Sequence, residues 1–385
     1  MLLQIYALVV LVYWMVLSYY LIINGKKINY LSSLKITSIQ FPSVAIIIAV
    51  RNEEADLKNA LISVCNLDYN NFKIIVVNDR STDNTGNILK ALQKDFPIEV
   101  INIETLPPGW LGKNYALFSG FSKSAEEYML FTDADVVFKE DVLGKAMHFV
   151  VKNDLDHLTI LPEITSQSSL LKSVLSTFII LLTAMQRPWA AKKKSSKASI
   201  GVGAFNLVKR KKYSQAGTHK AIAMRPDDDL QLAAMMKAAG GKADVLYGLN
   251  MIKVEWYKSV KEFINGLMKN AFSGFDYSLI KLIGGVIGVL LFFVLPVPVI
   301  LFFGNTSQII MLAFTVASQL ILFWQMPGSK GRWWFGFTLI YSGIVLVYIF
   351  IKAAFTNIRD GGIYWRETFY SLAELRKAKK FSRYL

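Results

Sequence analysis

Cysteine and histidine are scarce in this chain of 385 residues. The single cysteine, Cys65, excludes an internal disulfide and a cysteine-based metal cluster. The three histidines, His148, His157 and His219, are scattered and do not suggest a histidine-rich metal site. A bound metal ion would therefore be held by oxygen ligands, which favours a hard cation such as Mg2+ or Mn2+.

Two glycine-rich phosphate-binding motifs are also missing. No GxGxxG follows the first predicted strand, so a dinucleotide-binding site loses its main support. No GxxxxGK[ST] run occurs in the chain, which excludes a P-loop. A nucleotide would have to be bound in another way, for example through a metal ion held by carboxylates.

Charge is absent from residues 2–24, and hydrophobic residues make up 53% of the whole chain. At 1.5 Å per residue, this run is long enough to cross a hydrocarbon core of about 30 Å. Lys26 and Lys27 follow it, and neither the preceding basic residues nor the cleavage site of a signal peptide is present. We expect an uncleaved anchor, residues 1–25, in the cell (inner) membrane, with the next domain in the cytoplasm, where Lys and Arg accumulate.

Three further apolar runs in the C-terminal third predict a transmembrane bundle of two or three helices over residues 279–355. A basic cytoplasmic tail, 356–385, is expected after it. Crossing by the N-terminal anchor and all three runs would place that tail on the far side of the membrane. Either the tail breaks the rule that Lys and Arg stay in the cytoplasm, or one of the runs does not cross the membrane. The first run, which contains Pro296 and Pro298, is the suspect. The runs are residues 282–303, 309–326 and 333–355.

Acidic residues are absent between positions 187 and 225, which hold eleven Lys and Arg. Such a block is usually a solvated face or a nucleic-acid patch. In a membrane-anchored chain, attraction to anionic lipid headgroups, about 1 kcal/mol per residue, explains it better, and we expect no nucleic-acid partner. The preceding residues 170–185 are apolar but short for a span, so they fit a helix in the membrane interface or a buried core helix.

From Ser43 onward, short β-branched runs alternate with segments of helical periodicity. Strands that are apolar on both faces, with helices between them, indicate a parallel sheet of βαβ units. We therefore expect an α/β fold with a Rossmann-like, mostly parallel sheet, flanked by transmembrane helices at both ends. In such a sheet the ligand lies at the carboxyl ends of the strands. The predicted strands are residues 44–50, 73–78, 98–102 and 128–133.

Polar residues follow these strands directly. Arg51 and Glu53 come after the first strand, Asp79 after the second, and Asp133 and Asp135 after the fourth. Two aspartates at i and i+2 can turn toward one point and hold a divalent cation that bridges diphosphate oxygens. A turn or a helix cap is the structural alternative for this pair.

Four segments, AVRNEE, VVNDRSTDNT, FTDADVVF and RPDDDLQLAAMMKAAG, resemble in this order the motifs of family 2 glycosyltransferases, which have a GT-A fold. The resemblance covers roughly residues 43–275. It implies a nucleotide-sugar donor, most often a UDP-sugar, and inversion at the anomeric carbon. It also implies that Glu53 and Asp79 hold the nucleotide, and that Asp133 and Asp135 handle the diphosphate and its metal.

The three adjacent aspartates at 227 to 229 open a predicted helix that ends before Gly240. A helix cap needs only one aspartate, and crowding three together tends to raise the pKa of at least one toward a value useful for a base. Aligned with the family's acidic motif, the segment makes Asp229 the general base and Asp228 the first alternate.

The segment LPPGWLGKNYALFSGF, from Leu106, resembles a motif of the membrane-bound, lipid-directed branch of the family, which includes ceramide, carotenoid and hopanoid glycosyltransferases. Lys113 opens a helix there and can meet a phosphate, although a surface lysine is the alternative. GVGAFNLVKRK and GTHKAIAMRPDDD resemble acceptor-side segments. On this basis Trp110, His219 and Lys269 are assigned to the acceptor or diphosphate, with a purely structural role as the alternative for His219.

Processive members of the family carry Gln-x-x-Arg-Trp after the base, and this chain has no such motif in the corresponding stretch, residues 263–274. We therefore expect transfer of one sugar to a hydroxyl or carboxyl group of a membrane lipid. A processive polysaccharide synthase subunit and an inactive envelope scaffold are the alternatives.

Overall fold

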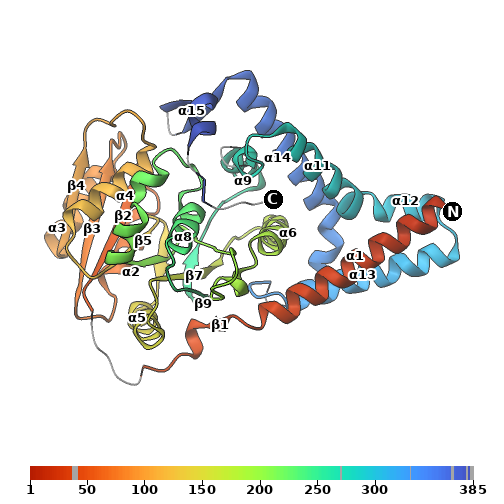
Figure 1. Cartoon of the computed structure of the whole chain (residues 1–385), viewed down its shortest axis with the longest axis horizontal. Helices are drawn as coiled ribbons and strands as arrows, with labels where there is room; N and C mark the ends of the chain where they lie inside the picture. The colour runs from red at the N-terminus through yellow and green to blue at the C-terminus, as the bar shows by residue number, and fades with distance from the viewer. Residues whose placement is uncertain (37–41, 269–270, 330, 366–367, 379, 382–385) are drawn as a thin grey trace.

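The structure is a computed structural model that describes residues 1–36, 42–268, 271–329, 331–365, 368–378 and 380–381. Its middle is a layered α/β domain, and long helices from the N-terminal end and from the C-terminal third of the chain pack together beside it (Figure 1). A nine-stranded sheet has the order β1-β9-β7-β8-β5-β2-β3-β4, with β6 paired to β9. The strands are β1 (Asn29–Tyr30), β2 (Val44–Val50), β3 (Phe72–Asp79), β4 (Ile98–Ile103), β5 (Tyr128–Thr132), β6 (Val136–Phe138), β7 (His157–Ile164), β8 (Asn206–Lys209) and β9 (Ala243–Val254).

Both faces of this sheet are buried. Along β2, Val44, Ile46 and Ile48 belong to one core and Ala45 and Ile47 to the other, as the two-residue repeat of a strand requires. A strand covered on both faces needs apolar residues throughout, which explains the sequence VAIIIAV. The first core includes α2 (Leu57–Cys65), α3 (Thr85–Asp95) and α5 (Val142–Asn153), and the second includes α4 (Gly112–Lys123), α7 (Arg210–Ala216) and α8 (Asp228–Ala238).

The predicted α/β class with a mostly parallel sheet is confirmed. Strands β2, β3, β4 and β5 are parallel to one another, while β8 is antiparallel to both of its neighbours. The four predicted strands match these parallel strands to within one residue at each end. The helix after β2 begins only at Leu57, because Asn52 has a left-handed backbone, with φ 54°, and the chain turns before the helix starts.

Among the described residues, four helices are long and apolar enough to cross a membrane, or up to five spans if a bent pair counts as one. Helix α1 (Leu2–Gly25) packs along α13 (Thr306–Gln325). Helix α14 (Leu339–Arg359) packs instead on α6, on α11 and on the short helices α9 and α10. These elements are α1 (Leu2–Gly25), α6 (Ser169–Gln186), α9 (Val260–Leu267), α10 (Ala271–Gly274), α11 (Leu279–Val289), a π-helical turn (Leu290–Val294), α12 (Pro296–Phe303), α13 (Thr306–Gln325) and α14 (Leu339–Arg359).

The bend between α11 and α12 is 52° and exposes two backbone carbonyls to α1. The π-helical turn and the missing N–H of Pro296 leave the carbonyls of Leu291 and Phe292 without their usual donors. The Tyr6 hydroxyl donates to the Leu291 carbonyl at 2.7 Å, and the Trp14 indole N–H donates to the Phe292 carbonyl at 2.9 Å. Side chains of α1 therefore satisfy the backbone groups that the bend frees, as a kinked helix in apolar surroundings requires.

The segment after α14, expected as a basic tail, folds back onto the α/β domain. It forms the hairpin of β10 (Gly362–Trp365) and β11 (Thr368–Ser371), followed by the short helix α15 (Leu372–Lys377). Apolar residues of the hairpin and of α15 pack with Leu111, which precedes α4. This docking brings the hairpin and α15 next to the carboxyl edge of the sheet.

Candidate active site

The loops after β2 and β3 are tied to each other at the carboxyl edge of the sheet. The Thr82 N–H donates to Oδ1 of Asn52 at 2.8 Å, and the Glu53 N–H donates to Oγ1 of Thr85 at 2.9 Å. The structure therefore holds the backbone of Glu53 beside the loop that begins at Asp79.

Asp79 ends β3 and is 3% exposed. Two nitrogens of Arg80 donate to its two carboxylate oxygens, at 2.7 and 3.1 Å, and a nitrogen of Arg51 lies 3.7 Å from Oδ2. Arg80 has a left-handed backbone, with φ 55°, which accompanies this return of its side chain onto the preceding residue. The buried carboxylate is therefore paired with two cations, as a buried charge requires.

The start of α4 and the C-terminal hairpin close the space around Asp79. A Cβ added to Gly112 would come within 2.3 Å of Oδ2 of Asp79, so only glycine fits there. Tyr370 lies over the same corner: burial raises the pKa of its hydroxyl, while the backbone N–H of Gly112 and the charge of Arg80 act in the opposite direction. The hairpin of β10 and β11 thus covers this corner of the site.

Lys113, in the first turn of α4, joins acidic residues of two other elements. Its Nζ lies 2.8 Å from Oδ1 of Asp133 and 3.5 Å from Oδ2 of Asp228. Burial opposes the charge of the ammonium, but the carboxylates of Asp133, Asp228 and Asp229 outweigh it and raise the pKa of this lysine. A lasting positive charge therefore lies at the amino end of a helix, where anions are also favoured by free N–H groups.

The loop before β8 brings Asp229 close to Asp133. The Gly203 N–H donates to Oδ2 of Asp229 at 3.0 Å, and the Gly203 carbonyl accepts from the Asp133 N–H at 2.9 Å. A Cβ at Gly203 would lie 2.0 Å from Oδ2 of Asp133, and one at Gly201 would lie 2.0 Å from the Asp229 carbonyl. The GVG segment is therefore a spacer, since a side chain at either glycine would push the acidic residues apart.

The acidic residues of the first turn of α8 have raised pKa values. Burial, followed by the charge of Asp228, raises the pKa of Asp229 to about 7, although Lys113 opposes this. Burial also raises the pKa of Asp228 despite its contact with Lys113. The two oxygens of Asp229 accept one backbone N–H each, from Gly203 and Leu230, which fixes the orientation of the carboxylate. Asp229 can therefore exchange a proton near neutral pH, as a general base must.

Asp135, in the turn between β5 and β6, faces other carboxylates. Burial, followed by the charges of Asp133 and Glu53, raises its pKa to about 7. Among the described residues, no group of three or more His, Cys, Asp or Glu side chains is arranged to hold a metal ion by itself. One or two carboxylates are enough for Mg2+ when phosphate oxygens complete the coordination, and a cation relieves the repulsion between them. Asp133 and Asp135 fit such a shared site.

Asp227 differs from the two aspartates that follow it. Two nitrogens of Arg225 donate to its oxygens at 2.8 and 3.0 Å, and the Gln231 amide donates to Oδ2 at 2.7 Å. The backbone N–H of Phe381 donates to the other end of that amide at 2.8 Å. Asp227 therefore belongs to a buried network that joins α8 to the C-terminal segment.

His219 is fully buried, at 0% exposed. Its Nδ1 is hydrogen-bonded to the Tyr213 hydroxyl, and burial, with the charge of Lys113, lowers its pKa to about 3. Its Nε2 has no partner among the described residues, and the residue lines a small cavity together with Lys113, Asp228 and Asp229. The ring is thus a neutral part of the wall behind the acidic residues.

The structure does not bring Trp110 into this cluster. Its ring lies 5.3 Å from that of Phe118 and 5.5 Å from that of Tyr115, and at 100° per residue both positions face away from Lys113 on α4. The remaining predicted residue, Lys269, lies outside the described residues.

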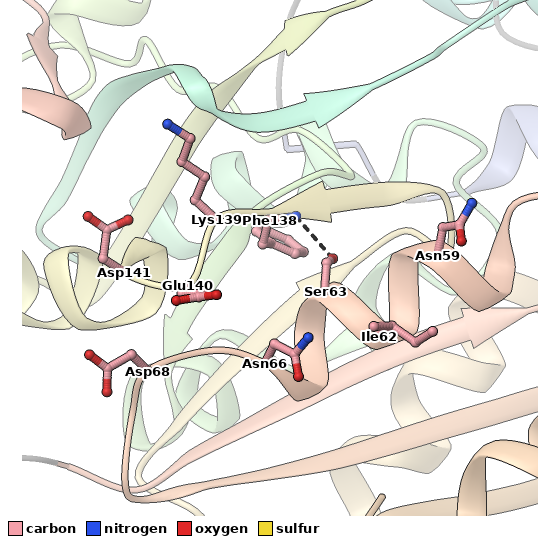
Figure 2. Close-up of a pocket in the computed structure, with 9 residues that line it drawn as sticks. All are labelled: Asn59, Ile62, Ser63, Asn66, Asp68, Phe138, Lys139, Glu140 and Asp141. Carbon is pink, nitrogen blue, oxygen red and sulfur yellow. Dashed lines mark hydrogen bonds between the residues drawn. The ribbon is translucent and has the colours of Figure 1, made fainter. Parts of the chain in front are cut away.

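A second hollow lies at the other end of the sheet (Figure 2). It is lined by the end of α2 and by the turn between β6 and α5, and Asp68 in its wall precedes β3. Ligands of open α/β sheets bind at the carboxyl ends of strands, which is the opposite edge. Figure 2 also shows Asp68, Glu140 and Asp141 spread around the hollow without meeting at one point. This hollow is therefore separate from the candidate active site.

Gly203, Arg80 and Tyr370 contribute to the site but are not predicted from the sequence. The GVG segment was expected only on the acceptor side, although two glycines around one valine are a usable signal of close backbone approach. Arg80 lies within the segment VVNDRSTDNT, but nothing in that segment indicates that its side chain turns back onto Asp79. Tyr370 has no local signal, because it reaches Gly112 only through the folding of the C-terminal segment.

Residues 45–217 match the family model described as Glycosyl transferase family 2. The match runs from β2 through the end of α7, so it contains Asp79, Asp133 and Asp135 and ends before Asp229. Residues 45–217 of this chain are therefore similar to a glycosyltransferase family 2 domain.

Two relatives are similar to parts of the chain. A poly-beta-1,6-N-acetyl-D-glucosamine synthase of Staphylococcus epidermidis is 31% identical over 171 residues, which are 44% of this chain and 40% of that protein. A probable glycosyltransferase of Bacillus subtilis, YdaM, is 35% identical over 98 residues, 25% of this chain and 23% of that protein. The chain thus matches less than half the length of these curated relatives.

One solved structure is similar over nearly the whole chain. The mannosyltransferase PcManGT from Pyrobaculum calidifontis, in complex with GDP-Man and Mn2+, has a TM-score of 0.55 and 15% identity. The similarity covers 93% of this chain and 99% of that one. It confirms the expected GT-A fold.

Proposed function

We propose that this protein is a metal-assisted, inverting hexosyltransferase of the membrane that moves one sugar from a UDP-sugar to a hydroxyl or carboxyl group of a membrane lipid. The observation that carries the proposal is one cluster: Lys113 bridges Asp133 and Asp228, and Asp229 is held beside them with a raised pKa. A positive charge for a departing diphosphate thus lies next to a group able to accept a proton.

The donor is proposed to bind across the carboxyl ends of β2, β3 and β5. Glu53 and Asp79, with Arg51, form the side that would receive the nucleotide. Lys113 and the amino end of α4 would bind the diphosphate. Asp133 and Asp135 would hold Mg2+ or Mn2+, which, when bound, would neutralise charge on the diphosphate. The Mn2+ and the nucleotide sugar in the mannosyltransferase of the same fold support both assignments.

The chemistry proposed for Asp229 is a proton transfer. The acceptor oxygen forms a bond to the anomeric carbon while the bond from that carbon to the diphosphate breaks, and the electron pair leaves with UDP. Asp229 takes the proton of the acceptor hydroxyl during this attack. With a pKa near 7, its carboxylate is substantially ionised at neutral pH and still basic enough to accept that proton.

A processive polysaccharide synthase is the second candidate. The named Staphylococcus epidermidis relative supports it, since it is a polysaccharide synthase that is 31% identical over 171 residues of this chain. The missing Gln-x-x-Arg-Trp motif favours a single transfer instead. An inactive envelope scaffold is disfavoured, because a scaffold has no use for glycine spacers that hold two carboxylates together.

The catalytic domain, residues 43–275, is proposed to lie on the cytoplasmic face of the inner membrane. Part of the basic block supports this location. Exposed lysines follow α6 shortly after Trp189, and the ring of Trp189 lies 5.3 Å from the ring of Tyr20 in α1. They are placed to meet anionic lipid headgroups at the end of α1. Other members of the block serve the domain itself, such as Arg210, which donates to the Glu126 carbonyl at 2.7 Å. The exposed lysines are Lys192, Lys193, Lys194 and Lys197.

The test is transfer by purified protein in lipid nanodiscs. UDP-sugars, Mn2+ and a bacterial lipid extract would be supplied, and products separated by size and identified by mass spectrometry. We expect one sugar per lipid, loss of activity with EDTA and its return with Mn2+. In Asp229→Asn we expect turnover to fall by about 10²- to 10⁴-fold with donor binding retained.

Each part of the proposal has its own contrary result. Chains of several sugars would establish the polysaccharide synthase instead. Unchanged turnover in Asp229→Asn would remove the base assignment, and full activity in EDTA would remove the metal. If the protein bound no UDP-sugar at all, the inactive envelope scaffold would be the favoured alternative.

A further inference from the structure

The α/β domain contains a direct indication that α6 does not cross a membrane. Its preceding strand, β7, and its following strand, β8, are hydrogen-bonded neighbours in the same sheet. A single crossing would separate these two strands by the thickness of a bilayer. Both ends of α6 therefore lie on the same side, although its length and apolar composition would allow a span.

The same reasoning applies to the C-terminal runs. They start after the α/β domain and lead to a segment that returns to it: Arg376 donates to the Tyr277 carbonyl at 3.3 Å, and Phe381 donates to Gln231 at 2.8 Å. The two ends of this part of the chain are therefore on one side of the membrane. The number of crossings between them must be even.

Two of these runs lie along α1. Ser18 of α1 donates to the Ser318 carbonyl of α13 at 3.1 Å, and near the other end Ser307 donates to Gln4 at 3.1 Å. Ala7 packs with residues of both α12 and α13. The turn between α12 and α13 thus lies at the amino end of α1, so the bent pair α11 and α12 runs toward that end and α13 runs back.

Helix α14 packs on α6, on α11 and on the π-helical turn after α11, and not along α1 or α13. In Figure 1, α14 leads away from α1 and α13 at a steep angle, whereas those two helices lie side by side. Val345, Leu346 and Ile349 pack with apolar residues of α6 and α9, which belong to the α/β domain. Within its apolar window, 44% of α14 is buried, compared with 28% for α1 and 33% for α13.

The outer face of α14 carries a continuous apolar stripe. Its members are spaced three and four residues apart, as positions on one side of a helix must be, and they are between 38% and 63% exposed. Arg359 folds over the ring of Phe355 at one end of the stripe. The stripe consists of Tyr341, Ile344, Tyr348, Ile351, Phe355 and Ile358.

We propose that α14 lies in the surface layer of the membrane, with this stripe toward the apolar layer and α6 on its inner side, and that the chain crosses only three times. The crossings are α1, the bent pair α11 and α12, and α13. The run at 333–355 is then the one that does not cross, in place of the proline-containing run that the sequence made suspect. The inference rests on the proposed function only in taking the apolar helices to be in a membrane.

The occupant of the stripe is the lipid bilayer, because α14 packs on α11 and the π-helical turn of the bent pair, whose apolar faces need the same environment. An even number of C-terminal crossings also returns the basic C-terminal segment to the side of the catalytic domain, as the preference of Lys and Arg for the cytoplasm requires.

Labelling of single cysteines tests the crossings. The native thiol would be removed by Cys65→Ser, and one cysteine introduced by Thr306→Cys, Gln325→Cys or Ala373→Cys, all at exposed positions. In spheroplasts with a membrane-impermeant maleimide, we expect labelling of the first variant at once and of the other two only after permeabilisation. Immediate labelling of Ala373→Cys together with Thr306→Cys would show that α14 crosses. Protection of Thr306→Cys would exclude the three crossings.

Depth measurement tests the position of α14 directly. Nitroxide labels on Ile344→Cys, Ile351→Cys and Ile358→Cys in liposomes should have the same shallow depth, whereas a crossing helix would give depths that change steadily along it. Matched labels along α1, on the exposed positions Ile5→Cys near its end and Val12→Cys near its middle, should differ from each other in depth. Neither measurement depends on activity, so the proposed chemistry and this placement can fail separately.

Discussion

Asp79 and Asp229 are two carboxylates at one edge of the sheet with opposite surroundings. Asp79 is held by Arg80 and Arg51, whereas Asp229 is crowded by Asp228, with Lys113 as the opposing charge. A buried carboxylate between cations is fixed in place, while one that burial and anions disfavour can take up a proton. The comparison divides the site into a half suited to holding a ligand and a half suited to moving a proton.

The largest effect on this comparison is expected from Gly203→Ala. The added Cβ would lie 2.0 Å from Oδ2 of Asp133, so this carboxylate and the N–H that holds Asp229 must both shift. Displacement of about 1 Å can cost a factor of about 100 in rate, and we expect a loss of this size in kcat. Steady-state rates with saturating UDP-sugar would measure it.

Gly274→Ala is the matched control, because a Cβ at Gly274 meets nothing within 4 Å. We expect its kcat to stay close to that of the wild type. A Gly203→Ala enzyme with unchanged kcat would show that the two acidic residues need not be close, and the division of the site would lose its basis.

A smaller effect is expected from Asp79→Asn, and on the other half of the site. Loss of a charged hydrogen-bond partner costs about 1.5 kcal/mol, which corresponds to roughly tenfold weaker donor binding. The kcat at saturating donor should change little. Isothermal titration with UDP, together with steady-state kinetics, would separate the two quantities.

Asp154→Asn provides the control for this substitution, since Asp154 pairs with Lys242 on the surface, where its side chain is 73% exposed. It should alter neither donor binding nor kcat. A collapse of kcat in Asp79→Asn with normal UDP binding would place Asp79 in the half that moves protons and would contradict the comparison.

The fold could be predicted because its cause is local. A strand covered on both faces must be apolar at every position, so β2 and β3 are visible in the sequence, as are the acidic residues that follow them. The candidate carboxylates could be named for the same reason, since the carboxyl ends of parallel strands share one edge.

The rest depended on contacts between distant segments. Nothing near Tyr370 in the sequence indicates that it meets Gly112, and the pairing of Trp14 with the carbonyl freed by Pro296 follows from helix packing. The direction of α14 was also hidden, because an apolar run has the same composition whether it crosses a membrane or lies in its surface.

The smallest and most specific effect is expected from Asp228→Asn, through pH. In the wild type the base must be ionised, so kcat should rise with pH through about 7, the pKa to which burial and Asp228 raise Asp229. Removing the charge of Asp228 lowers this pKa, so the acidic limb of the kcat profile should move to lower pH. Steady-state rates across this range, with Asp154→Asn as the unshifted control, would measure the displacement.

The pH dependence of stability should also move to lower pH in Asp228→Asn. The folded pKa of Asp229 lies above its ordinary value of 3.8, so protonation favours the folded state, and this contribution is lost as pH rises from about 4 to about 7. Melting temperatures at about pH 6 and about pH 8 should therefore differ less in Asp228→Asn than in the wild type. If neither the kcat profile nor this difference moved, the charge of Asp228 would not set the proton affinity of Asp229, and crowding by anions would no longer distinguish Asp229 from Asp79.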